Sequence, residues 1–175
     1  MPQYDADNAE CLVFSSKDGL LAGLAHDLKM RVDRFSVEVD TAHKTVEASF
    51  DPHSVRVVCA QIDGRDQPSL LSPGDRDRID ENIASEVLHA DRHPEIRFES
   101  TAVTPRDRGY TLEGLLSLHG QRRAVVAEVE SAGDQWVTEV SIHQQDFGIR
   151  PFKAALGTLR IKPDVLVQLR VPRQV

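Results

Sequence analysis

The sequence predicts an all-β fold, in which antiparallel strands are accompanied by one amphipathic helix. Apolar and polar residues alternate with a period of two in nine segments, which is typical of strands with one buried face. A period-four apolar pattern is convincing in only one segment, at about residues 75–89. Hydrophobic residues make up 40% and charged residues 28% of the 175-residue chain, as in a globular protein with a core. We therefore expect a single domain over residues 1–175.

Four strand candidates precede the helix. Leu12 and Phe14 begin the first one. In residues 35–40, Phe, Val and Val alternate with Ser, Glu and Asp. In residues 46–50, Val, Ala and Phe alternate with Glu and Ser. Val, Val and Cys alternate in residues 55–59. Each pattern indicates a strand with one apolar face and one polar face.

The predicted helix has recognisable start and stop signals. Residues 72–75, Ser-Pro-Gly-Asp, supply an N-cap hydroxyl, a proline at the first helical position and an acid in the first turn. Ile79, Ile83 and Val87 recur every four residues and form its apolar side. Pro94 ends the helical pattern, because a proline forces the residue before it into an extended conformation.

Five further strand candidates follow the helix, at residues 96–101, 112–118, 125–129, 136–142 and 165–171. Strands of this kind fit either a two-sheet sandwich or a barrel of about eight strands. The proposed inner face carries many small residues, which leaves room for a cavity: Ala48, Cys59, Ser100, Gly114, Ala127 and Thr138. Small residues also let two sheets pack closely, so a filled core is an equal alternative at this point.

Composition and charge exclude several function classes. The net charge is −7 and no stretch is rich in Lys or Arg, which argues against a nucleic-acid partner. The longest apolar stretch, residues 20–25, is too short to span a membrane. The first ten residues have no signal-peptide pattern, so the expected location is the cytoplasm. Cys11 and Cys59 lack CxxC spacing and are expected to be small buried apolar residues.

Four segments, taken in order, resemble the YceI-like family, which is described as polyisoprenoid-binding and lipocalin-like. They are residues 81–101, 110–125, 140–151 (which contain Asp-Phe-Gly-Ile) and 162–171. The resemblance implies an eight-stranded antiparallel β-barrel with one helical segment and an elongated apolar pore. It also implies that the pore holds a long isoprenoid or a similar amphiphile. A further segment with His26-Asp27 resembles a subset of the family.

The function hypothesis is therefore non-catalytic binding or carrying of a polyisoprenoid, quinone or fatty acyl lipid inside the barrel, with no cofactor. Gly114 would provide clearance, Trp136 would lie at a rim, and Arg150 would contact a phosphate headgroup. His26 precedes a strand and would face the headgroup, although a simple turn explains the pair His26-Asp27 at least as well. The candidate ligand-binding residues are Phe14, His26, Phe35, Val37, Phe50, Phe98, Leu112, Gly114, Leu116, Trp136, Val140, Ile142, Phe147 and Arg150.

Catalytic and metal sites have little support in the sequence. No GxSxG nucleophile motif is present, and His89 and His93 cannot share a helical face because Pro94 ends the helix there. We expect neither a catalytic residue nor a metal site. Two alternatives stay open. One is a lipocalin-like enzyme that uses His26 or His119 as acid or base. The other is a structural protein with a filled core that forms a homodimer through the outward residues Leu115, Val126 and Leu166.

Overall fold

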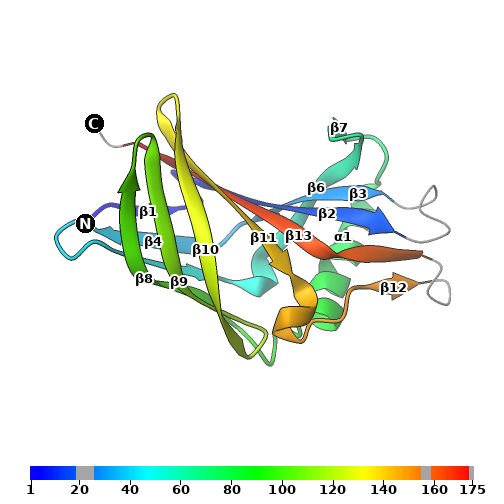
Figure 1. Ribbon diagram of the computed structural model, residues 1–175. Helices are drawn as coiled ribbons and strands as arrows, with labels where there is room; N and C mark the ends of the chain where they lie inside the picture. The colour runs from blue at the N-terminus through cyan, green and yellow to red at the C-terminus, as the bar shows by residue number, and fades with distance from the viewer. Residues whose placement is uncertain (19–25, 155–158, 174–175) are drawn as a thin grey trace.

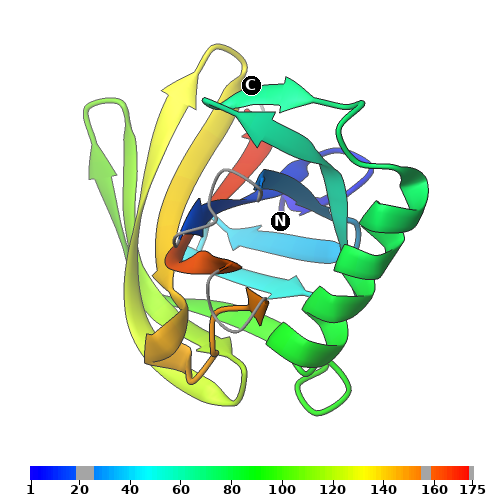
Figure 2. The same cartoon turned by 90° about the vertical axis from the view of Figure 1, so that its right-hand side faces the viewer.

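The computed structural model describes residues 1–18, 26–154 and 159–173 (Figure 1). Within these residues, 13 strands form one antiparallel sheet that curls around an interior space, and one α-helix lies along its side (Figure 2). This confirms the all-β, lipocalin-like fold class. Because the strands follow one hydrogen-bonded order, the two-sheet sandwich is wrong. Residues 22–25, which belong to the segment that resembles a family subset, lie outside the described residues.

The order of the strands in the sheet is β1-β4-β5-β8-β9-β10-β11-β13-β2-β3-β6-β7, and β12 pairs with β13. Sequential hairpins account for most neighbours, as expected for antiparallel strands joined by short turns. The strands are β1 (Gln3–Asp5), β2 (Glu10–Asp18), β3 (Asp27–Val32), β4 (Phe35–Asp40), β5 (Thr45–Phe50), β6 (Val55–Ile62), β7 (Arg65–Gln67), β8 (Ile96–Arg106), β9 (Gly109–Leu118), β10 (Gln121–Ala132), β11 (Gln135–His143), β12 (Lys153–Ala154) and β13 (Leu159–Pro172).

The strand count differs from the predicted eight because one long hairpin is bent. β3 runs into β4, and β5 runs into β6 through the short 3-10 turn η2 (Pro52–Ser54). At the bend, the Asp33 amide donates to Ser54 O at 3.0 Å and the Asp51 amide donates to Arg34 O at 3.0 Å. One half of the hairpin pairs with β8 and the other half with β2, so the hairpin joins both sides of the curled sheet. β1, β7 and β12 add only two or three residues each.

Helix α1 (Pro73–Asn82) begins at the residues that the sequence indicates. The Asp75 amide donates to Ser72 Oγ at 3.1 Å, and the Ser72 amide donates to Asp75 Oδ2 at 3.2 Å. This reciprocal capping box satisfies two amides that have no partner inside the helix. The Asp80 carboxylate accepts from the Val57 amide at 2.7 Å and attaches the helix to β6.

The end of the helix differs from the prediction. After α1, the chain widens into the single π-helical turn η3 (Ile83–Val87), in which the Leu88 amide donates to Ile83 O at 2.9 Å. His89 then adopts a left-handed conformation with φ 45°, which ends the helix at once. Regular helix therefore ends before residue 89, where the sequence predicted its last residue. The left-handed backbone at His89 ends it, and not Pro94.

Two clusters of buried side chains form the core. One surrounds Met30, Phe35 and Val55, and the other contains Leu118 and Phe147 together with Ile142 and Ile149. Both cysteines are buried and free, as predicted. Among the described residues, no helix combines the length and the apolar character that crossing a membrane requires. Members of both clusters, such as Met30 and Leu118, face the interior space inside the curled sheet.

Candidate functional site

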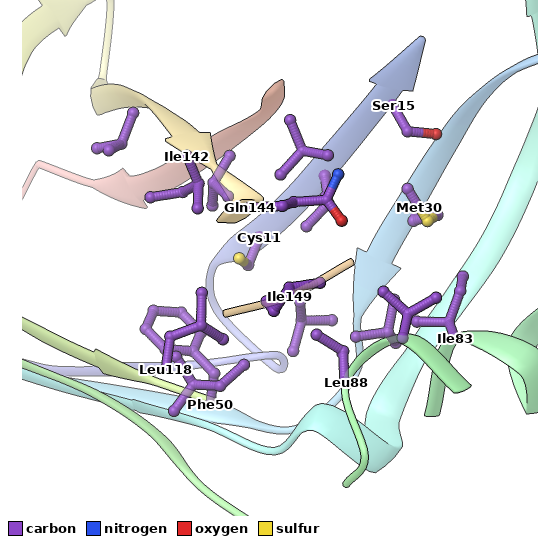
Figure 3. Close-up of a pocket in the computed structure, with 18 of the residues that line it drawn as sticks. Cys11, Ser15, Met30, Phe50, Ile83, Leu88, Leu118, Ile142, Gln144 and Ile149 are labelled. Atoms are coloured by element: carbon purple, nitrogen blue, oxygen red, sulfur yellow. The ribbon is translucent and has the colours of Figure 1, made fainter. Parts of the chain in front are cut away.

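The interior of the curled sheet contains a cavity of about 460 Å³. This volume falls within the roughly 300–1,000 Å³ that is usual for small-molecule sites. Its wall is formed by side chains of β2 to β6, β8 to β11 and β13, and by the helical segment α1–η3. Most of these side chains are aliphatic or aromatic (Figure 3). The interior is therefore not packed solid, and the filled-core alternative is wrong.

Strand alternation supplies most of the wall. In β9, Leu112, Leu116 and Leu118 line the cavity, whereas Glu113 faces solvent. In β13, every second residue from Val165 to Leu169 lines it as well. Successive side chains of a strand point to opposite faces, so one apolar set per strand is enough to build the wall.

The helical segment closes one side of the cavity. Ile79, Ile83 and Val87, the period-four residues of the sequence pattern, all line it, as do Leu71 and Leu88. Residues four apart lie on the same side of a helix, which is why this set faces inward together. The predicted amphipathic helix thus forms part of the cavity wall.

Eight of the predicted ligand-binding residues lie on the cavity wall. They come from six different segments of the chain, which the curled sheet brings around one space. These residues are His26, Val37, Phe50, Phe98, Leu112, Leu116, Val140 and Ile142.

Two predicted aromatic residues lie elsewhere. Phe14 is on the face of β2 opposite to Val13 and Ser15, which line the cavity. Its placement on the inner face is therefore a wrong prediction, and the reason is the strand alternation itself. Phe35 stacks on Phe50 with 5.9 Å between ring centroids and belongs to the first core cluster, but only Phe50 of the two lines the cavity.

Gly114 does not provide clearance for a ligand. A Cβ atom at this position would lie 2.6 Å from Glu99 O and even closer to the ring of Phe98. The phenyl ring of Phe98 occupies the space over Gly114 and itself lines the cavity. Gly114 is needed for the close approach of Phe98 and the neighbouring strand, so the predicted role is corrected.

The remaining three predicted residues also lie away from the cavity wall. Trp136 contacts Tyr110 edge-on, with 5.5 Å between ring centroids, and the guanidinium of Arg173 lies 4.6 Å from its ring centroid. Phe147 is buried in the second core cluster, and Arg150 is exposed. The predicted contact between Arg150 and a phosphate therefore has no support from its position.

The sequence patterns missed three polar residues of the cavity wall, Ser15, Gln144 and Arg160. Together with the predicted His26, we call them the polar end of the cavity. Ser15 could have been found from its alternation with Cys11 and Val13. Gln144 could not, because it lies in the 3-10 turn η4 (Gln144–Phe147) after β11, where no periodic pattern applies.

The opposite part of the cavity, which we call the apolar end, is formed by Cys11, Val46, Leu112, Ala127, Thr138 and Leu169. The hydroxyl of Thr138 donates to Glu128 O at 2.7 Å and so has a partner within the sheet. Burial, together with the neighbouring charge of Glu10, raises the pKa of Cys11 to about 12. The thiol is therefore neutral near pH 7, and this end offers a hydrocarbon-like surface.

A cluster of three histidines lies beside η4. The ring of His119 is 5.3 Å from that of His89 and 4.6 Å from that of His93, between centroids, and its Nδ1 lies 3.2 Å from Phe147 O. Burial lowers the pKa of His119 below its ordinary value, although the Phe147 carbonyl opposes this effect. In the part of the chain that the structure describes, no three His, Cys, Asp or Glu side chains are placed to hold a metal ion.

Comparisons with known proteins agree with this architecture. A family model described as YceI-like domain matches residues 4–172. A crystal structure of BcnA from Burkholderia cenocepacia is similar, with a TM-score of 0.65 at 15% identity over 95% of this chain and 97% of that one. A polyisoprenoid binding domain from Saccharophagus degradans, implicated in plant cell wall breakdown, gives 0.58 at 15% identity over 97% and 98%.

A third similar structure is the YceI protein of Campylobacter jejuni. Its TM-score is 0.53 at 13% identity, over 83% of this chain and 85% of that chain. A comparison with curated protein sequences finds no significant match. At these identities the structural neighbours establish the shared fold, and the family model covers nearly the whole chain.

Proposed function

The chain belongs to the YceI-like family, as the sequence resemblance predicted, and from this membership and the apolar cavity we propose that it binds a long-chain lipid without chemical turnover. The observation that carries the proposal is the cavity itself. Its volume of about 460 Å³ is bounded almost entirely by hydrocarbon side chains. A lipid tail is the class of molecule that such a surface favours.

The length of the tail follows from the free energy of burial. Each carbon that is transferred from water contributes roughly 0.8 kcal/mol, so one five-carbon isoprene unit contributes about 4 kcal/mol. The loss of translational and rotational freedom on association costs ~4 to 15 kcal/mol. A single isoprene unit therefore does not bind measurably, and several units are required. This reasoning supports a ligand of the polyisoprenoid type, with quinone tails and fatty acyl chains as chemically similar alternatives.

The relatives support the same proposal. The Saccharophagus degradans domain of similar fold is described as polyisoprenoid binding. The similarity of fold to that domain covers 97% of this chain. We extend the binding of a polyisoprenoid from that protein to this one as the working assignment.

The test is a titration with isoprenoid alcohols of 10, 15 and 20 carbons, followed by native mass spectrometry of the protein purified without detergent. Affinity should rise steeply with each added unit until the cavity is full, because burial of the tail drives binding. Organic extraction of the purified protein, with mass analysis of the extract, should recover a long-chain lipid. The proposal would be overturned if none of the alcohols forms a complex with the protein, or if the affinity does not depend on the length of the alcohol.

A further inference from the structure

The polar end of the cavity contains two deeply buried uncharged groups. Ser15 and Gln144 are each 6% exposed, and both line the cavity (Figure 3). They come from opposite sides of β13. Val165 of β13 pairs with Ser15 of β2 and with Ile142 of β11, which precedes Gln144 by two residues. The fold therefore brings a hydroxyl and an amide to the same end of one cavity.

The orientation of the Gln144 amide is fixed by the backbone of β13. The pairing of β13 with β2 shifts register between Ile161 and Val165, and Lys162 lies inside this irregularity. Gln144 Nε2 donates to Lys162 O at 3.2 Å. A carbonyl oxygen only accepts hydrogen bonds, so the nitrogen must face Lys162 and the Oε1 atom must face away from it. Figure 3 shows this oxygen directed into the cavity.

Within the described residues, the side chain of Gln144 takes part in hydrogen bonding through its nitrogen. No hydrogen bond within residues 1–18, 26–154 and 159–173 reaches Gln144 Oε1 or the Ser15 hydroxyl. Both groups line the cavity, so the amide oxygen and the hydroxyl are available to a polar group of a ligand that enters it. Gln144 Oε1 requires a donor, whereas the Ser15 hydroxyl either donates or accepts.

Charged headgroups fit this end less well. Arg160 lines the cavity, but its side chain is 48% exposed, and its Nε lies 3.5 Å from Asp18 Oδ2, which offsets its charge. A phosphate or carboxylate beside Gln144 Oε1 would bring acceptor against acceptor. The removal of such an anion from water would also lack compensation from a buried cation.

We propose that the ligand of this cavity is a long-chain amphiphile with an uncharged hydroxyl head, which donates to Gln144 Oε1 and accepts from Ser15. This inference rests on the proposed lipid-binding function and adds the chemistry of the head. The tail then extends from the polar end toward Ala127 and Leu169 at the apolar end. A primary alcohol satisfies both protein groups, because it is one donor and one acceptor at a single oxygen atom.

The experiment compares four ligands with the same 20-carbon isoprenoid tail: the alcohol, its methyl ether, its phosphate and the hydrocarbon without a head. Competition in native mass spectrometry against the wild-type chain gives their relative affinities. The alcohol should bind about tenfold more tightly than the ether, because the ether cannot donate to Gln144 Oε1. The phosphate should bind no more tightly than the ether.

Three variants locate the effect. In Gln144→Leu, the alcohol and the ether should bind equally, since the acceptor is gone. Gln145→Leu changes the exposed neighbour in the same turn and should keep the tenfold preference. Ser15→Ala should reduce the preference by a smaller factor.

The outcomes separate the two proposals. Equal binding of alcohol and ether by the wild-type chain, or tightest binding of the phosphate, would overturn the hydroxyl head but leave lipid binding intact. An unchanged preference for the alcohol in Gln144→Leu would also overturn it. If none of the four ligands binds, the proposed function itself fails.

Discussion

The two ends of the cavity use the same kinds of side chain in opposite ways. At the apolar end, the Thr138 hydroxyl donates to Glu128 O at 2.7 Å, so its polar atom is satisfied by the sheet. At the polar end, Gln144 uses its nitrogen for the backbone and directs its oxygen inward. The difference teaches that polarity along the wall is arranged by the backbone, since each side chain is oriented by a main-chain carbonyl. An amphiphile should therefore bind in one direction only.

The largest effect should come from blocking the apolar end. Ala127 lines the cavity and is 6% exposed, so Ala127→Trp would place an indole where the end of the tail lies. Displacement of one isoprene unit costs about 4 kcal/mol, or roughly a thousandfold in affinity for the 20-carbon alcohol. Titration should show that the 10-carbon alcohol loses far less, because its tail does not reach Ala127.

Val126→Trp is the matched control for this prediction. Val126 is adjacent in β10 but 59% exposed on the outer face, so the same indole there should leave both affinities unchanged. Equal losses for the short and the long alcohol in Ala127→Trp would contradict the direction of binding. Urea unfolding of both variants would show whether the fold is preserved.

The next effect concerns the wall between the two ends. Gly114→Ala would place a Cβ 2.6 Å from Glu99 O and closer still to Phe98, a contact that the backbone cannot relieve. We expect the free energy of unfolding to fall by about 3 kcal/mol. Urea denaturation monitored by circular dichroism measures it.

Gly74→Ala serves as the control for the glycine substitution. Its Cβ would meet only Ser72 Oγ, at 3.9 Å, near the start of α1. Replacement of a helical glycine by alanine at an unstrained position should change stability by roughly 1 kcal/mol or less, in the favourable direction. If Gly114→Ala were as stable as Gly74→Ala, the close packing of Phe98 on β9 would be disproved.

The smallest effect is a pH dependence beside the polar end. Burial lowers the pKa of His119, whose Nδ1 contacts Phe147 O in η4, while the rings of His89 and His93 pack against it. The unfolded chain, with a histidine pKa near 6.5, therefore takes up this proton first as the pH falls. The free energy of unfolding should be retained above about pH 6.5 and should decrease as the pH falls through the folded pKa.

Substitution of His119 tests this pH dependence. His119→Asn removes the titrating imidazole and should therefore reduce the loss of stability on acidification. Asparagine is chosen because it tolerates the left-handed φ of 52° at this position. His43→Asn is the control. Asp40 raises the pKa of that exposed imidazole, so the removal of His43 should change the pH dependence of stability in the opposite direction. Urea midpoints measured from pH 8 to pH 5 distinguish them. Parallel curves for His119→Asn and wild type would refute the assignment to His119.

Local patterns predicted much of the cavity wall but could not choose between two apolar faces. In β9 the alternation is clean, and Leu112 and Leu116 are placed correctly. In β2 both faces carry apolar residues, so the prediction took the face of Leu12 and Phe14, whereas Cys11 and Val13 line the cavity. The helix was predictable because the period-four apolar residues follow directly after the capping residues that begin at Ser72.

The parts that escaped prediction depend on contacts between segments far apart in the sequence. Gln144 gains its role from the carbonyl of Lys162, which the irregular register of β13 brings to it. The bend of the long hairpin depends on backbone hydrogen bonds across the chain, from Asp33 to Ser54 and from Asp51 to Arg34. A pattern of two or four residues carries no information about partners at such separations.

The shortness of β1 and β7 has a consequence for the behaviour of the protein in concentrated solution. These strands terminate the described order of the sheet, and each has only three residues. A long flat outer strand would present unpaired amides and carbonyls to other copies of the chain and promote aggregation through strand addition. Edge strands of three residues, one of which carries the charges of Arg65 and Asp66, offer few backbone hydrogen bonds to an incoming strand. The short edge strands thereby limit aggregation through strand addition in a protein whose sheet encloses an apolar interior.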